Sequence, residues 1–170
     1  PLNHQRTVDV ARLLHLPMIC LHTVADNCVA RYLTDLFEQK QPARLKDVLT
    51  ILKEIPEYKK SSRQAVPPRL LHGSEDGRAG KIYVDMTGGT EGPKDIFSQQ
   101  VAAGVSTLVG MHFSEEALDK CKSARLNVIV AGHMASDTLG LNLLLDQIER
   151  EANEELKVTG ISGFERIKHL

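Results

Sequence analysis

The spacing of apolar residues predicts helices through the first third of the chain. A short apolar face indicates a helix over about residues 5–15. Apolar residues at i, i+3, i+4, i+7 and i+8 over 29–37 are typical of an amphipathic helix, which Pro42 ends. The same spacing recurs over 45–52 and stops at Pro56, so a further helix is expected there.

Shorter apolar runs predict strands. Residues 17–22 fit a buried strand, and Cys20 is expected to pack there. The stretch 57–68 is polar, basic and irregular, which is typical of a surface excursion. Two apolar runs, 69–73 and 81–86, flank a Gly-containing turn and predict a hairpin.

Strands and helices alternate from about residue 80 onward. The predicted elements are a helix near 96–101, a strand at 107–111, a helix capped by Ser114 through Cys121, a strand at 127–132, a helix over 134–152 and a strand at 156–159. Successive crossovers of this kind imply parallel strands with helices on both faces. With the antiparallel hairpin added, we expect a single α/β domain over residues 1–170, with a mixed, largely parallel sheet.

Composition narrows the class of protein. The chain has 170 residues, 42% of them hydrophobic and 25% charged, which is typical of a globular domain. The formal net charge of −1 does not support nucleic-acid binding, and no apolar run is long enough to predict a membrane span. Three cysteines without a CxxC pair favour reduced thiols and a cytoplasmic protein.

Two short segments carry the candidate chemistry. His22 and Asp26 are four residues apart, as are His133 and Asp137, and each pair follows an apolar run and precedes a helical pattern. Residues at i and i+4 share one helix face, and imidazole with carboxylate is a common ligand set for divalent metals. The alternative is a histidine at a strand end and an ordinary acid in the first turn of a helix.

Two further features lie at predicted sheet ends. The loop containing Gly88, Gly89, Thr90 and Glu91 places backbone N–H groups where they can bind an anion or a substrate, although a plain tight turn explains it equally well. His112 follows a predicted strand, so it is a candidate catalytic proton shuttle or a support for a metal ligand; a surface histidine is the alternative.

The motifs resemble those of a known family. The segments that carry the resemblance are 21–27 (LHTVADN), 86–92 (MTGGTEG), 109–115 (VGMHFSE) and 131–138 (AGHMASDT). They are similar to the NGG-interacting-factor-like proteins, dinuclear-metal proteins also known as type 2 GTP cyclohydrolase I. The segments occur in the family's order over most of the chain.

This resemblance implies a three-layer α/β sandwich with two divalent metal ions in a cleft; Zn, Mn and Fe are not distinguished. It implies that His22, Asp26, His133 and Asp137 are metal ligands, and that the protein forms a ring-shaped homo-oligomer. The implied activity is metal-dependent hydrolysis of a nucleotide or another phosphorylated small molecule. The alternative is a metal-binding regulatory or scaffold protein without turnover.

The sequence departs from the family pattern at two places. Asp137 stands where the family usually has Glu, so the side chain reaches less far. The family also has neighbouring histidines upstream of the first motif, which the segment Asn3-His4 does not match. Because the chain begins at Pro1, we expect it to be the C-terminal portion of a longer metal-binding protein.

Overall fold

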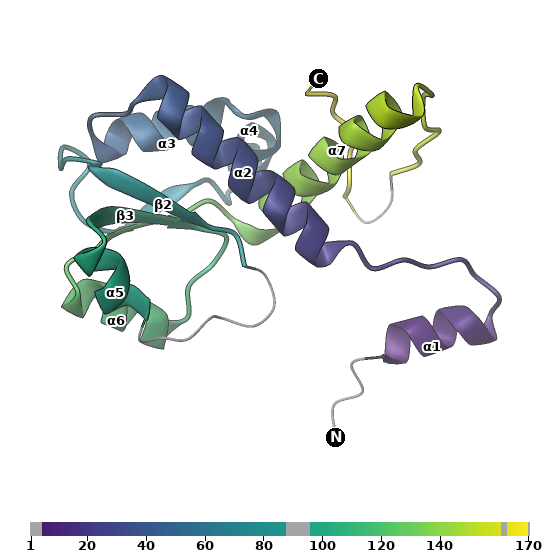
Figure 1. Ribbon diagram of the computed structural model, residues 1–170, viewed down its shortest axis with the longest axis horizontal. Helices are drawn as coiled ribbons and strands as arrows, with labels where there is room; N and C mark the ends of the chain where they lie inside the picture. Colours follow the sequence, from purple (N-terminus) through teal and green to yellow (C-terminus); the bar gives the residue numbers. More distant parts are fainter. Residues whose placement is uncertain (1–4, 88–95, 161–162, 170) are drawn as a thin grey trace.

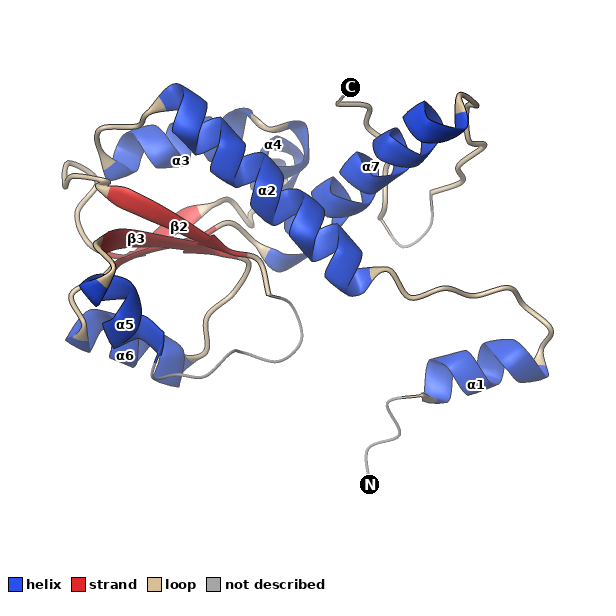
Figure 2. Cartoon of the chain, in the orientation of Figure 1, coloured by secondary structure: helices blue, strands red, loops and turns tan. Residues whose placement is uncertain are grey.

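The computed structural model describes residues 5–87, 96–160 and 163–169. In chain order the described elements are α1 (Arg6–Leu13), α2 (His22–Lys40), α3 (Leu45–Glu54), α4 (Pro56–Arg63), β1 (Arg69–His72), β2 (Lys81–Asp85), α5 (Ile96–Ala102), β3 (Val105–Gly110), α6 (Glu115–Ser123), β4 (Asn127–Val130) and α7 (His133–Ala152). Figure 2 shows the sheet between helices on its two faces. The predicted α/β class is confirmed.

The described strands form one mixed sheet in the order β1-β4-β3-β2. Strands β2, β3 and β4 run parallel, and β1 pairs antiparallel with β4. Helices α2, α3 and α4 lie on one side of the sheet and α5 and α6 on the other (Figure 1). The largely parallel sheet and its two helical layers agree with the sequence prediction.

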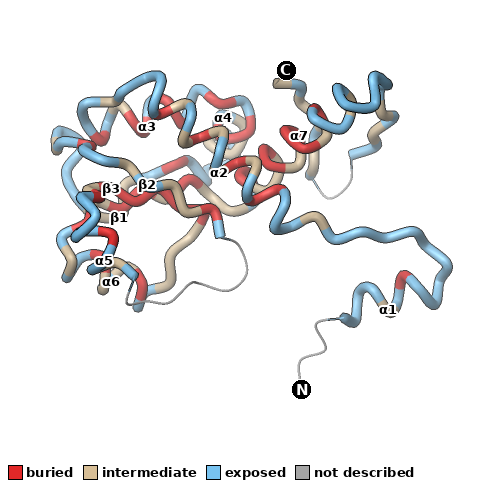
Figure 3. Tube along the Cα trace, in the orientation of Figure 1, coloured by how far each residue is buried: buried red, intermediate tan, exposed pale blue. Residues whose placement is uncertain are grey.

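A hydrophobic core fills each side of the sheet. On one side Leu33 and Leu52, both fully buried, belong to a cluster that includes Val109 and Ile129 of the central strands. On the other side a smaller cluster surrounds Cys121. Figure 3 shows this buried centre and the exposed course of α1, which is set apart from the body.

Helices α2 and α7 pack closely against each other. A Cβ at Gly140 would lie 2.3 Å from the backbone oxygen of Ala25, so the crossing requires glycine. The crossing lies in the N-terminal half of both helices, since Ala25 is in the first turn of α2 and Gly140 is in the first half of α7. This contact therefore sets the distance between His22 and His133.

The prediction of a buried strand at 17–22 is wrong. Residues 16–21 have no regular structure, His22 is already helical, and Ile19 and Cys20 are exposed. The described sheet offers this segment no neighbouring strand. Because a strand needs a paired edge to satisfy its backbone groups, an apolar run alone does not make one.

The predicted hairpin is also wrong, although both of its strands exist. Strands β1 and β2 occupy opposite edges of the sheet, with β4 and β3 between them. The intervening turn instead contacts the start of α3, where the backbone N–H of Leu45 donates to Gly77 and that of Lys46 donates to Glu75. The antiparallel pairing comes from β1 with β4.

The structure differs from the sequence prediction at two further stretches: one is helical where a surface excursion was predicted, and the other is irregular where a strand was predicted. The predicted surface excursion at 57–68 contains α4, which Pro56 opens and whose Tyr58 is fully buried. The predicted strand at 156–159 has no regular structure. Spacing missed α4 because the helix has only one turn of buried residues, Glu57 and Tyr58.

The C-terminal segment, residues 163–169, is held against α7 and α4 by polar contacts. The Arg166 guanidinium lies 2.5 Å from the Asp146 carboxylate and 2.9 Å from that of Glu149. The backbone N–H of Ile167 donates to Asn142 at 3.2 Å. These contacts join the end of the chain to the helix that begins with His133.

Among the described residues, no helix has the length and apolarity needed to span a membrane.

Candidate metal centre

Both histidine–aspartate pairs begin a helix. His22 is the first residue of α2 and His133 the first of α7. Gly132 precedes α7 with φ 107°, a backbone conformation that favours glycine and that lets the chain turn from β4 into the helix. The i, i+4 spacing then places Asp26 and Asp137 on the same faces as their histidines.

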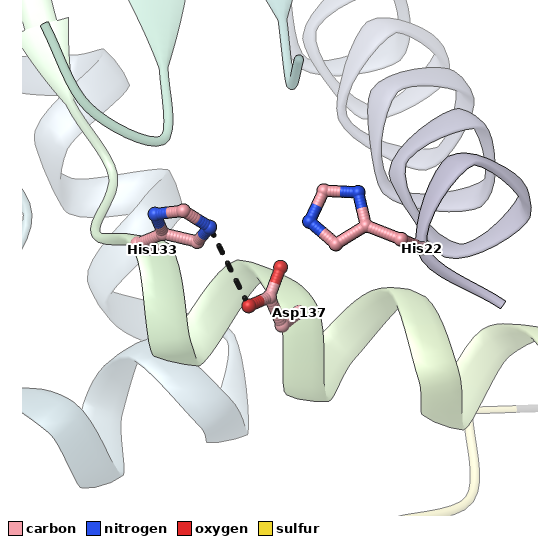
Figure 4. Close-up of side chains that lie close together, drawn as sticks. All are labelled: His22, His133 and Asp137. Atoms are coloured by element: carbon pink, nitrogen blue, oxygen red, sulfur yellow. Dashed lines mark ion pairs between the residues drawn. The ribbon is translucent and has the colours of Figure 1, made fainter. Parts of the chain in front are cut away.

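Three of the four predicted ligands come together. His22, His133 and Asp137 each offer one ligand atom, and these atoms all lie within 4.8 Å of one another. Figure 4 shows the His22 ring pointing from α2 toward the other two side chains on α7. Metal–ligand bonds of about 2.0–2.2 Å hold ligand atoms roughly 3–4 Å apart, so small side-chain rotations complete such a site.

The fourth predicted ligand, Asp26, lies beside this group. Its Oδ2 is 3.1 Å from Nδ1 of His22, and the residue is 8% exposed. On α7, Nε2 of His133 is 3.6 Å from Oδ2 of Asp137. In the two pairs the histidines are about equally exposed, whereas Asp26 is more buried than Asp137.

His112 enters the same cluster from the end of β3. Its ring stacks on that of His133, with centroids 5.0 Å apart and an interplanar angle of 5°. Its Nδ1 is buried and has no hydrogen-bond partner among the described residues. An unsatisfied buried nitrogen costs free energy, so this atom is suited to a ligand or a proton.

The electrostatics of the cluster centre on Asp137. Burial raises the pKa of its carboxyl group, and the nearby charge of Asp26 raises that pKa further. Charges on His133, His22 and His112 act in the opposite direction, yet the pKa remains above its usual value. A bound cation would favour the ionised carboxylate, so the cluster fits a divalent metal electrostatically.

A buried hydrogen-bond chain supports the first turn of α7. The Ser136 hydroxyl donates to the Gly132 carbonyl at 2.7 Å, and the Tyr58 hydroxyl lies 2.8 Å from the same Ser136 oxygen. Both side chains are fully buried, and burial raises the pKa of Tyr58. The sequence prediction missed Tyr58 because it placed that residue in a surface loop. The signal available in the sequence was an aromatic residue two positions after Pro56, where a helix can begin.

The loop of Gly88, Gly89, Thr90 and Glu91 lies outside the described residues, so its predicted anion-binding role stays a prediction. At its described edge, the Asp85 carboxylate accepts hydrogen bonds from the backbone and the hydroxyl of Thr87.

Comparison with solved structures identifies proteins whose overall structures are similar to this chain. The chain is similar to a NIF3 superfamily protein from Sphaerobacter thermophilus, with 28% identity and a TM-score of 0.69 over 94% of this chain and 59% of that one. It also shares the fold of a Bacillus cereus protein related to NIF3, with 14% identity and a TM-score of 0.51 over 71% and 31% of the two chains.

No family model matches the chain, and no curated protein matches it either. The chain spans about three fifths of the length of the Sphaerobacter protein and about a third of the Bacillus one. The chain therefore has an α/β fold similar to that of NIF3 superfamily proteins.

Proposed function

We propose that this chain binds divalent metal ions and that it is a metal-dependent hydrolase. The observation that carries the proposal is the convergence of His22, His133 and Asp137, whose ligand atoms lie within 4.8 Å of one another although they come from two separate helices. A solvated helix face gives no reason for such convergence.

The ligand set suits two ions of the Zn, Mn or Fe type. His22, His133 and Asp137 would hold one ion. Asp26, next to His22 and close enough to influence Asp137, would contribute to the second. The proposal of two ions comes from the family that the sequence motifs resemble, and the structural similarity to a NIF3 superfamily protein is in line with that resemblance. Homo-oligomer formation is a further expectation from the family resemblance.

Bound divalent ions would polarise an oxygen-rich substrate and lower the pKa of a water molecule to about 7. The protein's own side chains would orient the metal ligands and transfer protons. Stacking on His112 fixes the His133 ring, and Nδ1 of His112 is available to exchange a proton with the reacting group. The substrate class we propose is a nucleotide or another phosphorylated small molecule, with the loop 88–91 binding its anionic part.

Metal analysis of matched variants tests the metal centre. After loading with Zn²⁺ or Mn²⁺ and gel filtration, the wild-type chain should retain metal, and His133→Ala should reduce its content at least tenfold. His15→Asn is the control, because His15 is exposed and has a positive φ that Asn tolerates. Equal metal content in all three proteins would contradict the proposal.

Turnover separates the hydrolase from a metal-binding scaffold. We expect metal-loaded protein to hydrolyse GTP or a phosphoester. His112→Phe keeps a ring that can stack on His133 but removes the ring nitrogens, so it should slow turnover while retaining metal. Metal retention without turnover across these substrates would support the scaffold alternative instead.

A further inference from the structure

A pocket of about 440 Å³ opens beside the candidate metal centre. Its walls come from α4, α7 and the C-terminal segment, and Asp137 lies in its lining. The lining includes apolar side chains from α7 and the C-terminal segment, namely Leu141, Phe164 and Ile167. The volume is within the usual range for small-molecule sites, which combine apolar walls with a few polar groups.

Charge in this pocket is predominantly negative. Its lining includes three acidic residues, Glu57, Asp137 and Glu165, against one basic residue, Lys60. Lys60 is paired with Glu165, their charged atoms being 2.5 Å apart. The lining therefore favours a neutral or cationic ligand over an anionic one.

Glu57 supplies a second and independent sign of a ligand. The side chain is 1% exposed. Its Oε1 accepts from the Asn142 amide at 2.9 Å and contacts Nε2 of His169 at 2.8 Å. The other oxygen, Oε2, has no hydrogen-bond partner among the described residues. Because a buried carboxylate oxygen is costly to leave unsatisfied, this atom indicates a missing N–H donor.

We propose that this pocket binds the uncharged or cationic, N–H-bearing ring of a small molecule. The N–H groups face Glu57, the ring packs against Phe164 and Leu141, and the remainder of the molecule extends toward Asp137. The identification of this ligand with the hydrolase substrate rests on the proposed function. Binding of the ring in the pocket does not require a metal.

Two probes of the same shape and opposite charge test the pocket. Benzamidine carries a cationic N–H pair on a phenyl ring, and benzoate carries a carboxylate on the same ring. Calorimetric titration of the metal-free chain should show benzamidine binding at least tenfold more tightly than benzoate, with the preference kept after metal loading. Similar affinities, or benzamidine binding that appears only with metal, would overturn the proposal.

A charge substitution localises the binding. Gln64 is exposed and lines the pocket, so Gln64→Lys should fold normally and weaken benzamidine about threefold through charge repulsion. Gln147→Lys adds the same charge at an exposed site farther along α7 and should leave the affinity unchanged. Equal effects of both variants would overturn the assignment to this pocket. Metal content is measured separately, so failure here is distinct from failure of the metal centre.

Discussion

Asp137 stands between the two sites described above. Its carboxylate lies close to His22 and His133, and the same residue lines the pocket between α4, α7 and the C-terminal segment. Burial and the Asp26 charge both raise its pKa, so the ionised carboxylate is less stable here than in water. Asp137 lies close to both histidines because its helix and α2 each begin with one of them.

Substitution of Asp137 tests its role as a ligand. Asp137→Asn should fold as well as the wild type, since it removes a partly buried charge, but should retain at least tenfold less metal. Asp137→Glu keeps the carboxylate and should retain metal. Metal analysis and thermal unfolding measure the two effects. Full metal retention by Asp137→Asn would show that this carboxylate is not a ligand.

The pairing of α2 with α7 is the contact between elements on which the centre depends. Each helix carries one histidine–aspartate pair, and the close approach at Gly140 brings the pairs together. The sequence predicted both helices because their apolar spacing is long and regular. It did not predict their crossing, because nothing in the spacing identifies Ala25 as the partner of Gly140.

Gly140→Ala tests this crossing. The added Cβ meets the backbone of Ala25 rather than a flexible side chain, so the helices must separate. We expect a loss of about 1–3 kcal/mol in the free energy of unfolding and a reduced metal content. Gln147→Ala, at an exposed position of α7, should change neither quantity. Chemical denaturation and metal analysis measure both; a fully stable, metal-retaining Gly140→Ala would contradict the proposed role of the crossing.

Strand predictions show where local pattern stops being informative. The elements from β2 to α7 alternate as predicted, because crossover connections restrict the topology. The run 17–22 and the hairpin failed because strand pairing depends on distant residues: β1 pairs with β4, more than fifty residues later. The sequence predicted that each histidine–aspartate pair shares one helix face, because this depends only on local spacing. It did not predict the stacking of His112 on His133, because this depends on how the strands assemble into a sheet.

At the scale of the whole molecule, the C-terminal segment fastens the end of the chain to the helices that form the centre and the pocket. His169 contacts Glu57 on α4, and Arg166 joins Asp146 and Glu149 on α7. Burial acts to raise the pKa of Glu57, but hydrogen bonds from His169 and Asn142 bring that pKa below its ordinary value. The acid is thus bound to its partners mainly in the ionised form.

This contact predicts acid-sensitive stability. Because the folded-state pKa of Glu57 is lowered, its contribution is complete above the ordinary value of 4.5 and is lost as pH falls through the folded pKa. Glu57→Gln should therefore weaken the fall in unfolding free energy below about pH 4.5. Exposed Glu151→Gln is the control. Denaturation curves from pH 7 to 3 give the slopes, and identical slopes for all three proteins would exclude this role for Glu57.

The central claim is that His22, His133 and Asp137 hold a divalent metal, and locating the metal tests it most directly. Crystals of the Zn²⁺-loaded chain, measured on both sides of the zinc absorption edge, should give an anomalous peak within about 2.0–2.2 Å of one ligand atom from each residue. An anomalous map with no peak among these three side chains, in crystals whose protein binds zinc in solution, would contradict the account.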